Sequence, residues 1–318
     1  MPFNVLTMSS KIRSILKLLR VRQYYKNVMI FVGVFFSERL FEVSLYFPLL
    51  IGFILLCCTS SFNYIINDLR DIEKDKKHPE KIKNKPLASG DLSIFFAILT
   101  LIILVGISIL SLIFLIPNLG FILMIILLII TGQLYNHLLK NYAFTDIIIL
   151  STGYLWRALA GCAIIEEYVS PWLFLAIFEV AMFLSIAKRK GDLEFLGKDK
   201  ALEHKKVYNQ YSLKLLDQFH VIIAGSLFMT YSLYLILHFR LAEPGYVPVL
   251  YEYIAMLTIP ISLYLLMRYM YLTSADPRIA RNTERAFLDM GMIIAAFLIL
   301  VILFISFYYD TLIQFLNL

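Results

Sequence analysis

The segment FNYIINDLRDIEKDKKHPEKIKNKPLASG, residues 62–90, begins as the end of an apolar helix and turns into a dense run of charge. Asn67, Asp68, Asp71 and Asp75 place four oxygen-bearing side chains within nine residues, and lysines follow them. At about 100° per residue, these side chains fall within roughly a 100° arc of one helix. A one-sided cluster of carboxylates repels itself unless a cation lies among them. The segment therefore predicts a cation-binding helix end.

The composition is that of an integral membrane protein. Of the 318 residues, 60% are hydrophobic and 16% are charged, whereas soluble domains carry roughly a quarter charged residues. Apolar runs long enough to cross a bilayer recur along the whole chain, and a soluble helical core could not bury so much apolar surface. The three cysteines lie in apolar runs and the five histidines are scattered, so neither disulfides nor a zinc site is indicated.

The apolar runs predict an all-α bundle of about nine transmembrane helices in one membrane domain. The predicted spans are residues 24–39, 44–66, 92–114, 118–138, 144–164, 170–187, 213–238, 248–272 and 287–314.

The basic residues predict the orientation of these spans. With the N-terminus in the cytoplasm, 26 of the 29 lysines and arginines fall on the cytoplasmic side. Arg39 and Arg240 fall on the other side, and Arg157 lies within a span. Positive charge gathers on the cytoplasmic side of membrane proteins. We therefore expect a protein of the cytoplasmic membrane whose acidic helix end faces the cytoplasm.

Residues 1–22 are predicted to form an amphipathic helix in the membrane interface, ahead of a transmembrane domain over residues 23–318. In KIRSILKLLRVR, residues 11–22, one helical face is apolar and the basic residues lie away from it. Such a helix turns its basic side toward anionic headgroups. The apolar face consists of Ile12, Ile15, Leu16 and Leu19, and the basic residues are Lys11, Arg13, Lys17 and Arg20.

Hard oxygen ligands at a helix end suit Mg²⁺, which binds through one or two carboxylates and leaves the rest of its shell to water and phosphate. The alternative is a solvated helix end whose acids are neutralised by nearby lysines. Those lysines are Lys74, Lys76 and Lys77.

The stretch NDLRDIEKD, residues 67–75, resembles the NDxxDxxxD motif of the UbiA superfamily of intramembrane prenyltransferases. The dipeptide Lys26–Asn27, the stretch KNKPLASG at 83–90 and the stretch YNHLLK at 135–140 agree with that resemblance. It implies a UbiA-type helical bundle with a Mg²⁺-dependent active site on the cytoplasmic side.

The second motif of that superfamily, DxxxD, is incomplete here. After the sixth span this chain has AKRKGDLEFLG, residues 187–197, in which Asp192 is the only aspartate. This departure resembles the decaprenyl-phosphate phosphoribosyltransferase branch, as do VRQYYKN (21–27), HPEK (78–81) and GYLWRALAG (153–161). The branch implies phosphoribosyl diphosphate as donor and a polyprenyl phosphate lipid as acceptor, with lysines and arginines as phosphate ligands.

The resemblance implies roles for individual residues. Asn67 and Asp71 are expected to bind Mg²⁺, and Asp68 and Asp75 to complete its shell or hold ribose hydroxyls. The expected catalytic residues are therefore Asp68, Asp71 and Asp75. The expected substrate-binding residues are Lys26, Tyr64, Lys81, Lys85, Tyr135, Lys140, Arg157, Lys188, Arg189 and Asp192.

Two of these expectations have a physical basis in the sequence. An unpaired cation within a span costs several kcal/mol, so Arg157 is expected to bind a substrate phosphate, or else to pair with Asp146 or Glu179. At the end of the sixth span, the side chains of Lys188, Arg189 and Asp192 share one helical arc, so all three are expected to face the site together.

Two other functions are compatible with the sequence. An aromatic prenyltransferase of the UbiA type would use a prenyl diphosphate, and the basic second motif argues against it. A transporter or lipid-binding scaffold would be non-enzymatic, and the absence of an obvious repeat of broken helices argues against it. No nucleic-acid partner is indicated, and a homo-oligomer is compatible with the sequence.

Overall fold

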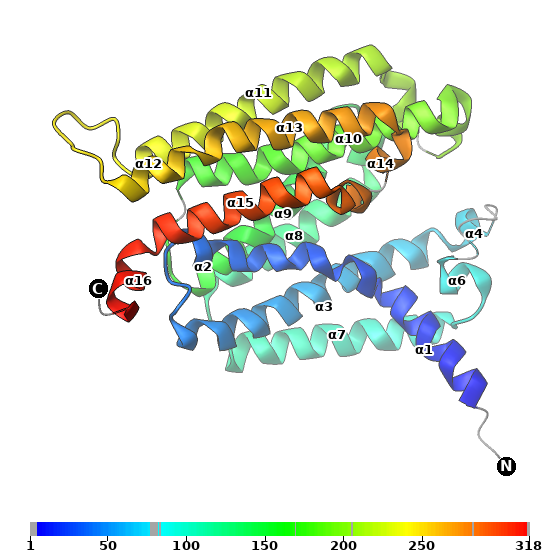
Figure 1. Ribbon diagram of the computed structural model, residues 1–318. Coiled ribbons are helices and arrows are strands. Elements are labelled where there is room, and N and C mark those ends of the chain that lie inside the picture. Colours follow the sequence, from blue (N-terminus) through cyan, green and yellow to red (C-terminus); the bar gives the residue numbers. More distant parts are fainter. Residues whose placement is uncertain are drawn as a thin grey trace. The chain divides into compact units, whose positions relative to one another are not determined.

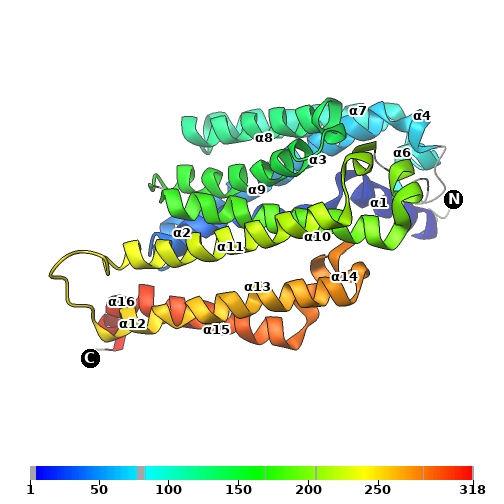
Figure 2. The ribbon, with the colours of Figure 1, turned by 90° about the horizontal axis from the view of Figure 1, so that it is seen from above.

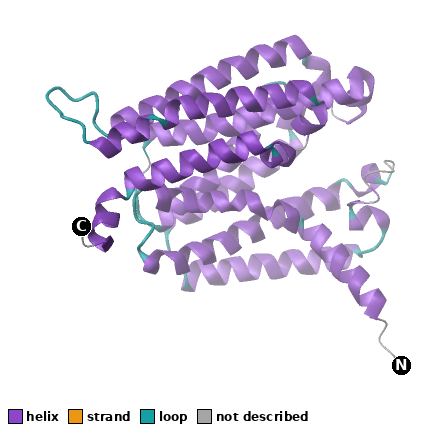
Figure 3. Cartoon of the chain, viewed as in Figure 1, coloured by secondary structure: helices purple, strands orange, loops and turns teal. Residues whose placement is uncertain are grey.

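The computed structural model describes residues 5–76, 82, 84–168, 170–204, 206–281 and 283–316. Over this part of the chain it contains helices and loops and no strand, as Figure 3 shows. The all-α fold class is confirmed. The chain folds into two compact units, Met1–Asn136 with Trp156–Tyr168, and His137–Leu155 with Val169–Leu318.

The first unit contains the long helices α3, α7 and α8, several shorter ones and the last part of α9 (Figure 1). Its elements are α1 (Val5–Leu19), η1 (Val21–Phe31), α2 (Val32–Phe36), η2 (Val43–Leu45), α3 (Tyr46–Arg70), α4 (Ile72–Asp75), α6 (Pro86–Ser89), α7 (Ile94–Phe114) and α8 (Leu119–His137).

The second unit contains the long helices α10, α11, α13 and α15 (Figure 2). Its elements are η3 (Leu139–Asn141), the first part of α9 (Thr145–Ile164), α10 (Pro171–His204), η4 (Lys206–Gln210), α11 (Leu213–His238), α12 (Leu250–Met256), α13 (Thr258–Ala275), α14 (Pro277–Arg281), η5 (Thr283–Leu288), α15 (Met290–Phe307) and α16 (Tyr309–Leu316).

Eight helices of the described chain are long and apolar enough to cross a membrane, and they correspond to predicted spans two to nine. The largest difference is in α10, which the sequence predicts to end at residue 187. The helix continues to His204, with a break at Gly197, where the backbone has a φ of 72°.

The predicted first span, residues 24–39, has a different local structure. Residues 21–31 form a 3-10 helix and only Val32–Phe36 are α-helical. A 3-10 helix rises about 2.0 Å per residue and an α-helix 1.5 Å. The two pieces together extend about 30 Å, which is the thickness of a bilayer's apolar core. A ninth crossing therefore stays a prediction.

Helix α7 shows why this fold requires a lipid environment. It is built almost wholly from apolar residues, yet Ala97 is its single buried residue. Its isoleucines are widely exposed, Ile102 at 63% and Ile113 at 59%. Water would not tolerate such an apolar surface on a folded protein. The chain is therefore an integral membrane protein.

Within the first unit, the C-terminal end of helix α1 packs against α3 and α6. Leu18 is fully buried in a cluster with Ile65 and Leu87. Ile12 and Leu16 are each 49% exposed, beside the basic residues of the same helix. The location of α1 in the membrane interface stays a prediction.

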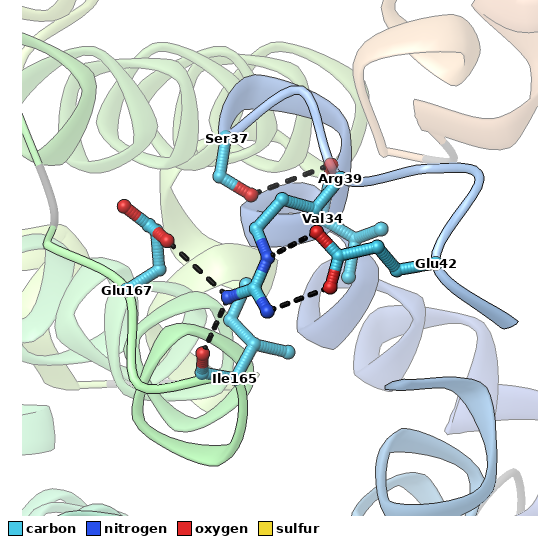
Figure 4. Close-up of polar contacts among 6 residues, drawn as sticks. All are labelled: Val34, Ser37, Arg39, Glu42, Ile165 and Glu167. Carbon is cyan, nitrogen blue, oxygen red and sulfur yellow. Dashed lines mark hydrogen bonds and ion pairs between the residues drawn. The ribbon is translucent and has the colours of Figure 1, made fainter. Parts of the chain in front are cut away.

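The Arg39 guanidinium forms an interaction, called here the guanidinium clamp, that links two segments of the first unit (Figure 4). Arg39 donates two hydrogen bonds to the carboxylate of Glu42, at 2.8 and 2.7 Å. It also donates to the Ile165 carbonyl oxygen at 2.9 Å and to Glu167 at 3.3 Å. The clamp joins the turn after α2 to the end of α9, two segments far apart in the sequence.

Within the first unit, α9 lies unusually close to η1. A Cβ atom added at Gly161 would lie 1.8 Å from the carbonyl oxygen of Ile30. The atoms that leave no room for a side chain at position 161 are therefore backbone atoms of Ile30, which cannot rotate away as a side chain could. The position requires glycine.

We expect Gly161→Ala to lower the free energy of unfolding by about 3 kcal/mol, because the backbone of η1 must move to admit the methyl group. The measurement is the thermal unfolding midpoint of the purified chain in detergent. Gly225→Ala is the matched control, since no heavy atom lies within 4 Å of a Cβ at that position. Equal midpoints for the two variants would contradict the close approach.

Candidate active site

The predicted acidic segment forms the junction of α3 and α4, which Figure 1 shows at the end of α3. Asp71 breaks the helix, with φ −94° and ψ 8°. Its N–H nevertheless donates to the Asn67 carbonyl, and the Asp75 N–H donates to the Asp71 carbonyl. These bonds keep Asn67, Asp71 and Asp75 one turn apart, as the spacing predicts.

Asp68 is buried and paired with two cations. Its side chain is 3% exposed. Its Oδ1 accepts from the Arg20 guanidinium at 2.7 Å and lies 2.9 Å from the Lys85 ammonium. Asp68 is therefore held by the protein's own charges.

Asp75 shares the same lysine. It is 1% exposed, and its Oδ2 accepts from Lys85 at 2.5 Å. Lys76, which the sequence offers as a neutralising cation, pairs instead with Glu73 at 2.7 Å. Among the described residues, Lys85 thus bridges Asp68 and Asp75, and Arg20 adds a second cation beside Asp68.

The sequence KPLASG explains the position of Lys85. Lys85 has an extended backbone and precedes Pro86 at the first position of α6, which is the conformation that proline imposes on its neighbour. Leu87 is buried against Leu18 and Ile65. Gly90 ends the helix in the left-handed region, at φ 80°, where glycine has no steric cost. Lys85 is therefore fixed by a short, anchored helix.

Arg20 lies against Asp68, a contact that sequence analysis missed because it assigned Arg20 to the headgroup-facing side of the N-terminal helix. Its guanidinium lies 4.4 Å from the ring centroid of Tyr64, a cation–π distance. Its backbone is left-handed, at φ 53°, which is uncommon for a residue with a Cβ. This left-handed backbone at Arg20 separates α1 from η1, and the helical periodicity of the sequence does not predict it.

Tyr64 and Lys26 both reach Gln23, which was also missed. The Tyr64 hydroxyl donates to Gln23 Oε1 at 2.6 Å. The Lys26 ammonium lies at a longer 3.5 Å from the same oxygen. The structure thus gathers Lys26, Tyr64 and the acidic segment in the first unit.

Asn67 and Asp71 differ from their neighbours. Both are half-buried, and neither side chain forms a hydrogen bond or ion pair with another residue of the described chain. The described residues hold no group of three or more His, Cys, Asp and Glu side chains placed for a metal. One amide and one carboxylate oxygen nevertheless fit Mg²⁺, which takes one or two protein ligands and fills its shell with water and phosphate.

We call Arg20, Tyr64, Asn67, Asp68, Asp71, Asp75 and Lys85 the acidic cluster.

Arg157 is buried on α9, at 8% exposure. Its Nε donates to Asn27 Oδ1 at 2.7 Å, and its Nη2 donates to Ser60 at 3.2 Å. Asp146 and Glu179, which the sequence offers as alternative partners, contact Arg189 and Ser226.

The predicted basic segment on α10 does not present its residues together. Lys188 is exposed, whereas Arg189 is 3% exposed and pairs with the fully buried Asp146 at 2.8 Å. Tyr211 donates a second hydrogen bond to Asp146, at 2.7 Å. Burial, and then this bond, raise the pKa of Tyr211 above its usual value, so its hydroxyl remains a donor. The residues occupy one arc of α10 as the spacing predicts, but the side chain of Arg189 points into the protein because it pairs with buried Asp146 of α9.

Asp192 is also engaged. It accepts from Arg281 at 2.9 Å and from the Tyr208 hydroxyl at 2.6 Å. Lys190 pairs with Asp217 at 2.6 Å. In the described chain Lys188 is the one cation of the triplet with no hydrogen bond or ion pair. We call Asp146, Lys188, Arg189, Lys190, Asp192 and Arg281 the basic cluster.

Three other predicted residues are less defined. Tyr135, near the end of α8, and Lys140, on η3, are half-buried. Lys81 lies outside the described residues.

Helices long and apolar enough to cross a membrane, some of which bear buried ion pairs, define an integral membrane protein. The model of the UbiA prenyltransferase family matches residues 27–291, and the chain belongs to that family. It is therefore a transferase.

Two similar proteins are decaprenyl-phosphate phosphoribosyltransferases. That of Mycobacterium tuberculosis (strain CDC 1551 / Oshkosh) is 27% identical over 214 residues, which cover 64% of this chain and 68% of that protein. That of Mycolicibacterium smegmatis is 26% identical over 229 residues, which cover 70% of each. A structure of a UbiA homolog from Archaeoglobus fulgidus bound to DMAPP and Mg²⁺ has a TM-score of 0.65 at 18% identity, covering 92% of this chain and 99% of that one. This likeness shows the fold.

We expect Arg189→Met to lower the free energy of unfolding by about 3–5 kcal/mol, because it leaves the buried Asp146 without its cation. Lys190→Met is the matched control on the same helix. Its partner Asp217 has a side chain that is 53% exposed, so the loss should be about 0–1 kcal/mol. Denaturation of the two purified variants measures the difference. Similar losses would mean that the Arg189 pair is not a buried one in solution.

Proposed function

We propose that the protein transfers the 5-phosphoribosyl group from phosphoribosyl diphosphate to a polyprenyl phosphate of the decaprenyl type, releasing diphosphate. The main support for this proposal is that the second motif is incomplete and contains one aspartate in place of two. Its single aspartate, Asp192, accepts hydrogen bonds from Arg281 and Tyr208, while Lys188 is exposed beside it. A position that offers a cation in place of a second acidic pair suits a substrate phosphate better than a second metal.

The names of the two mycobacterial relatives support the same reaction. The donor carries a diphosphate and a 5-phosphate, and the acceptor carries a phosphate monoester. These substrates together carry more negative charge, and so need more cationic ligands, than a prenyl diphosphate and an aromatic ring of the hydroxybenzoate type would need. The chain's surplus of lysine and arginine meets that need.

In the proposed reaction, an oxygen of the lipid phosphate attacks C1 of the ribose. The bond from C1 to the diphosphate oxygen breaks, and its electron pair leaves with the diphosphate. A phosphate monoester is already anionic near neutral pH, so the reaction requires no strong general base. Half-buried Asn67 and Asp71 would hold Mg²⁺ with the donor, and the A. fulgidus homolog was solved with this ion. The ion supplies positive charge that stabilises the departing diphosphate.

Lys188 would bind a substrate phosphate, and Arg157 the lipid phosphate or the donor diphosphate. Tyr64 would hydrogen-bond the donor. Arg189 and Asp192 are better assigned to positioning, because each already has a partner within the second unit.

The orientation forms part of the proposal. Phosphoribosyl diphosphate is a soluble, highly charged donor, which fits an active site at the cytoplasmic face. The distribution of lysine and arginine supports a location in the cytoplasmic membrane with that orientation.

An aromatic prenyltransferase is the second candidate, and the family membership favours it. It would pass a prenyl group from a prenyl diphosphate to a ring. The two candidates differ in which label reaches the lipid phase, so one assay separates them.

We expect membranes that contain the chain to move label from phosphoribosyl diphosphate, labelled in the ribose, into the lipid phase when a polyprenyl phosphate is present. Lys188→Met should lower kcat/KM by about ten- to a hundredfold, the equivalent of a charge-assisted contact worth 1.5–3 kcal/mol. Lys190→Met removes the same charge from a residue already paired with Asp217 and should stay close to wild type. Transfer of a prenyl group to a hydroxybenzoate-like ring, with no ribose label in lipid, would overturn the assignment.

The orientation has its own test. Reporter fusions after Asp91 and Lys200 should give a cytoplasmic signal, and a fusion after Glu243 an external one. A cytoplasmic signal at Glu243 would contradict the proposed orientation and the number of crossings.

A further inference from the structure

The acidic cluster contains more carboxylates than a single divalent cation needs, and the protein neutralises two of them itself. Arg20 and Lys85 contribute two positive charges, and Asp68 and Asp75 contribute two negative ones. All three contacts are 2.9 Å or shorter. Asp71 is the carboxylate of the cluster that has no ion pair among the described residues.

Lys85 lies between the carboxylates of Asp68 and Asp75 and bridges them. Its ammonium contacts Asp68 Oδ1 and Asp75 Oδ2 at once. Both carboxylates are nearly fully buried, and the lysine side chain is only 18% exposed. A metal ion could reach these oxygens only by displacing a buried charge, which would then need another partner.

We propose that Lys85 is a positioning residue that acts as a built-in counter-cation of the first acidic motif. It keeps Asp68 and Asp75 from serving as metal ligands, so the acidic cluster takes one divalent cation, through Asn67 and Asp71. This inference rests on the metal dependence in the proposed function, but not on which diphosphate is the donor.

The position of Lys85 in the fold supports this role. It is fixed by Pro86 and by the buried Leu87, so its stem does not have to be ordered when a substrate binds. The opposing interpretation is that Lys85 is a phosphate ligand and that its contacts with the two carboxylates give way to substrate. The two interpretations predict different numbers of bound metal ions.

The test counts Mn²⁺ ions per chain by equilibrium dialysis, with the full chain in nanodiscs and inorganic diphosphate at a fixed saturating concentration. Wild type should saturate at one ion. Lys85→Met keeps the stem and removes the charge, so it should gain a second binding step. Lys85→Arg keeps the charge and should remain at one ion. The double variant Lys85→Met with Asp75→Asn restores the balance of charge and should return to one ion.

Two further variants keep the inference testable if Lys85→Met does not fold. Asp71→Asn should weaken Mn²⁺ binding by about tenfold or more, because it removes a ligand. Asp75→Asn alone should weaken Mn²⁺ binding much less than Asp71→Asn does, because Asp75 is bound to Lys85 and not to metal. A tenfold loss in Asp75→Asn would overturn the inference.

Other outcomes would also overturn it. One is a wild-type chain that binds two Mn²⁺ ions or none. The other is a Lys85→Met variant that still binds one Mn²⁺ ion and has a lower affinity for diphosphate. A negative ribose-label assay combined with the expected ion counts would reject the phosphoribosyl donor and leave the role of Lys85 standing. The two failures are therefore distinguishable.

Discussion

The pairing of buried charge is the constraint on which the rest of this structure depends. Asp68, Asp75 and Asp146 are almost fully buried. Each lies against a cation from another part of its unit: Lys85 for the first two, and Arg189 for the third. A buried carboxylate without its cation costs several kcal/mol. The end of α3 and the middle of α10 are therefore fixed by these ion pairs as well as by apolar packing.

Apolar packing largely fixes the spans, and the sequence predicts them well. Residues 213–238 were predicted and observed as a helix with the same bounds, and α9 differs from its prediction by one residue at its start. Long apolar runs leave little choice in a bilayer, because every backbone group must be satisfied within the helix. The first span was harder to predict, since hydropathy does not distinguish a 3-10 helix from an α-helix.

The individual contacts of the candidate site could be predicted only in part. Helical spacing placed Asn67, Asp71 and Asp75 one turn apart, and the backbone bonds agree. The same reasoning placed Arg189 beside Lys188, yet a carboxylate 43 residues away draws Arg189 inward. The contact of Arg20 with Asp68 was likewise missed, because the two residues are 48 positions apart. Local periodicity carries no information about such distant partners.

This difference bears on how an acidic or basic motif should be interpreted. A side chain that already holds the fold must break a contact before it can bind a ligand, and the lost contact reduces the gain in binding. Asp68, Asp75, Arg189 and Asp192 are of this kind. Among the described residues, the side chains of Asn67, Asp71 and Lys188 carry no such contact. A motif of nine residues can thus supply both the support of a site and the groups that meet the substrate. Which of these two roles a residue of the motif has depends on the contacts that its side chain forms in the folded chain.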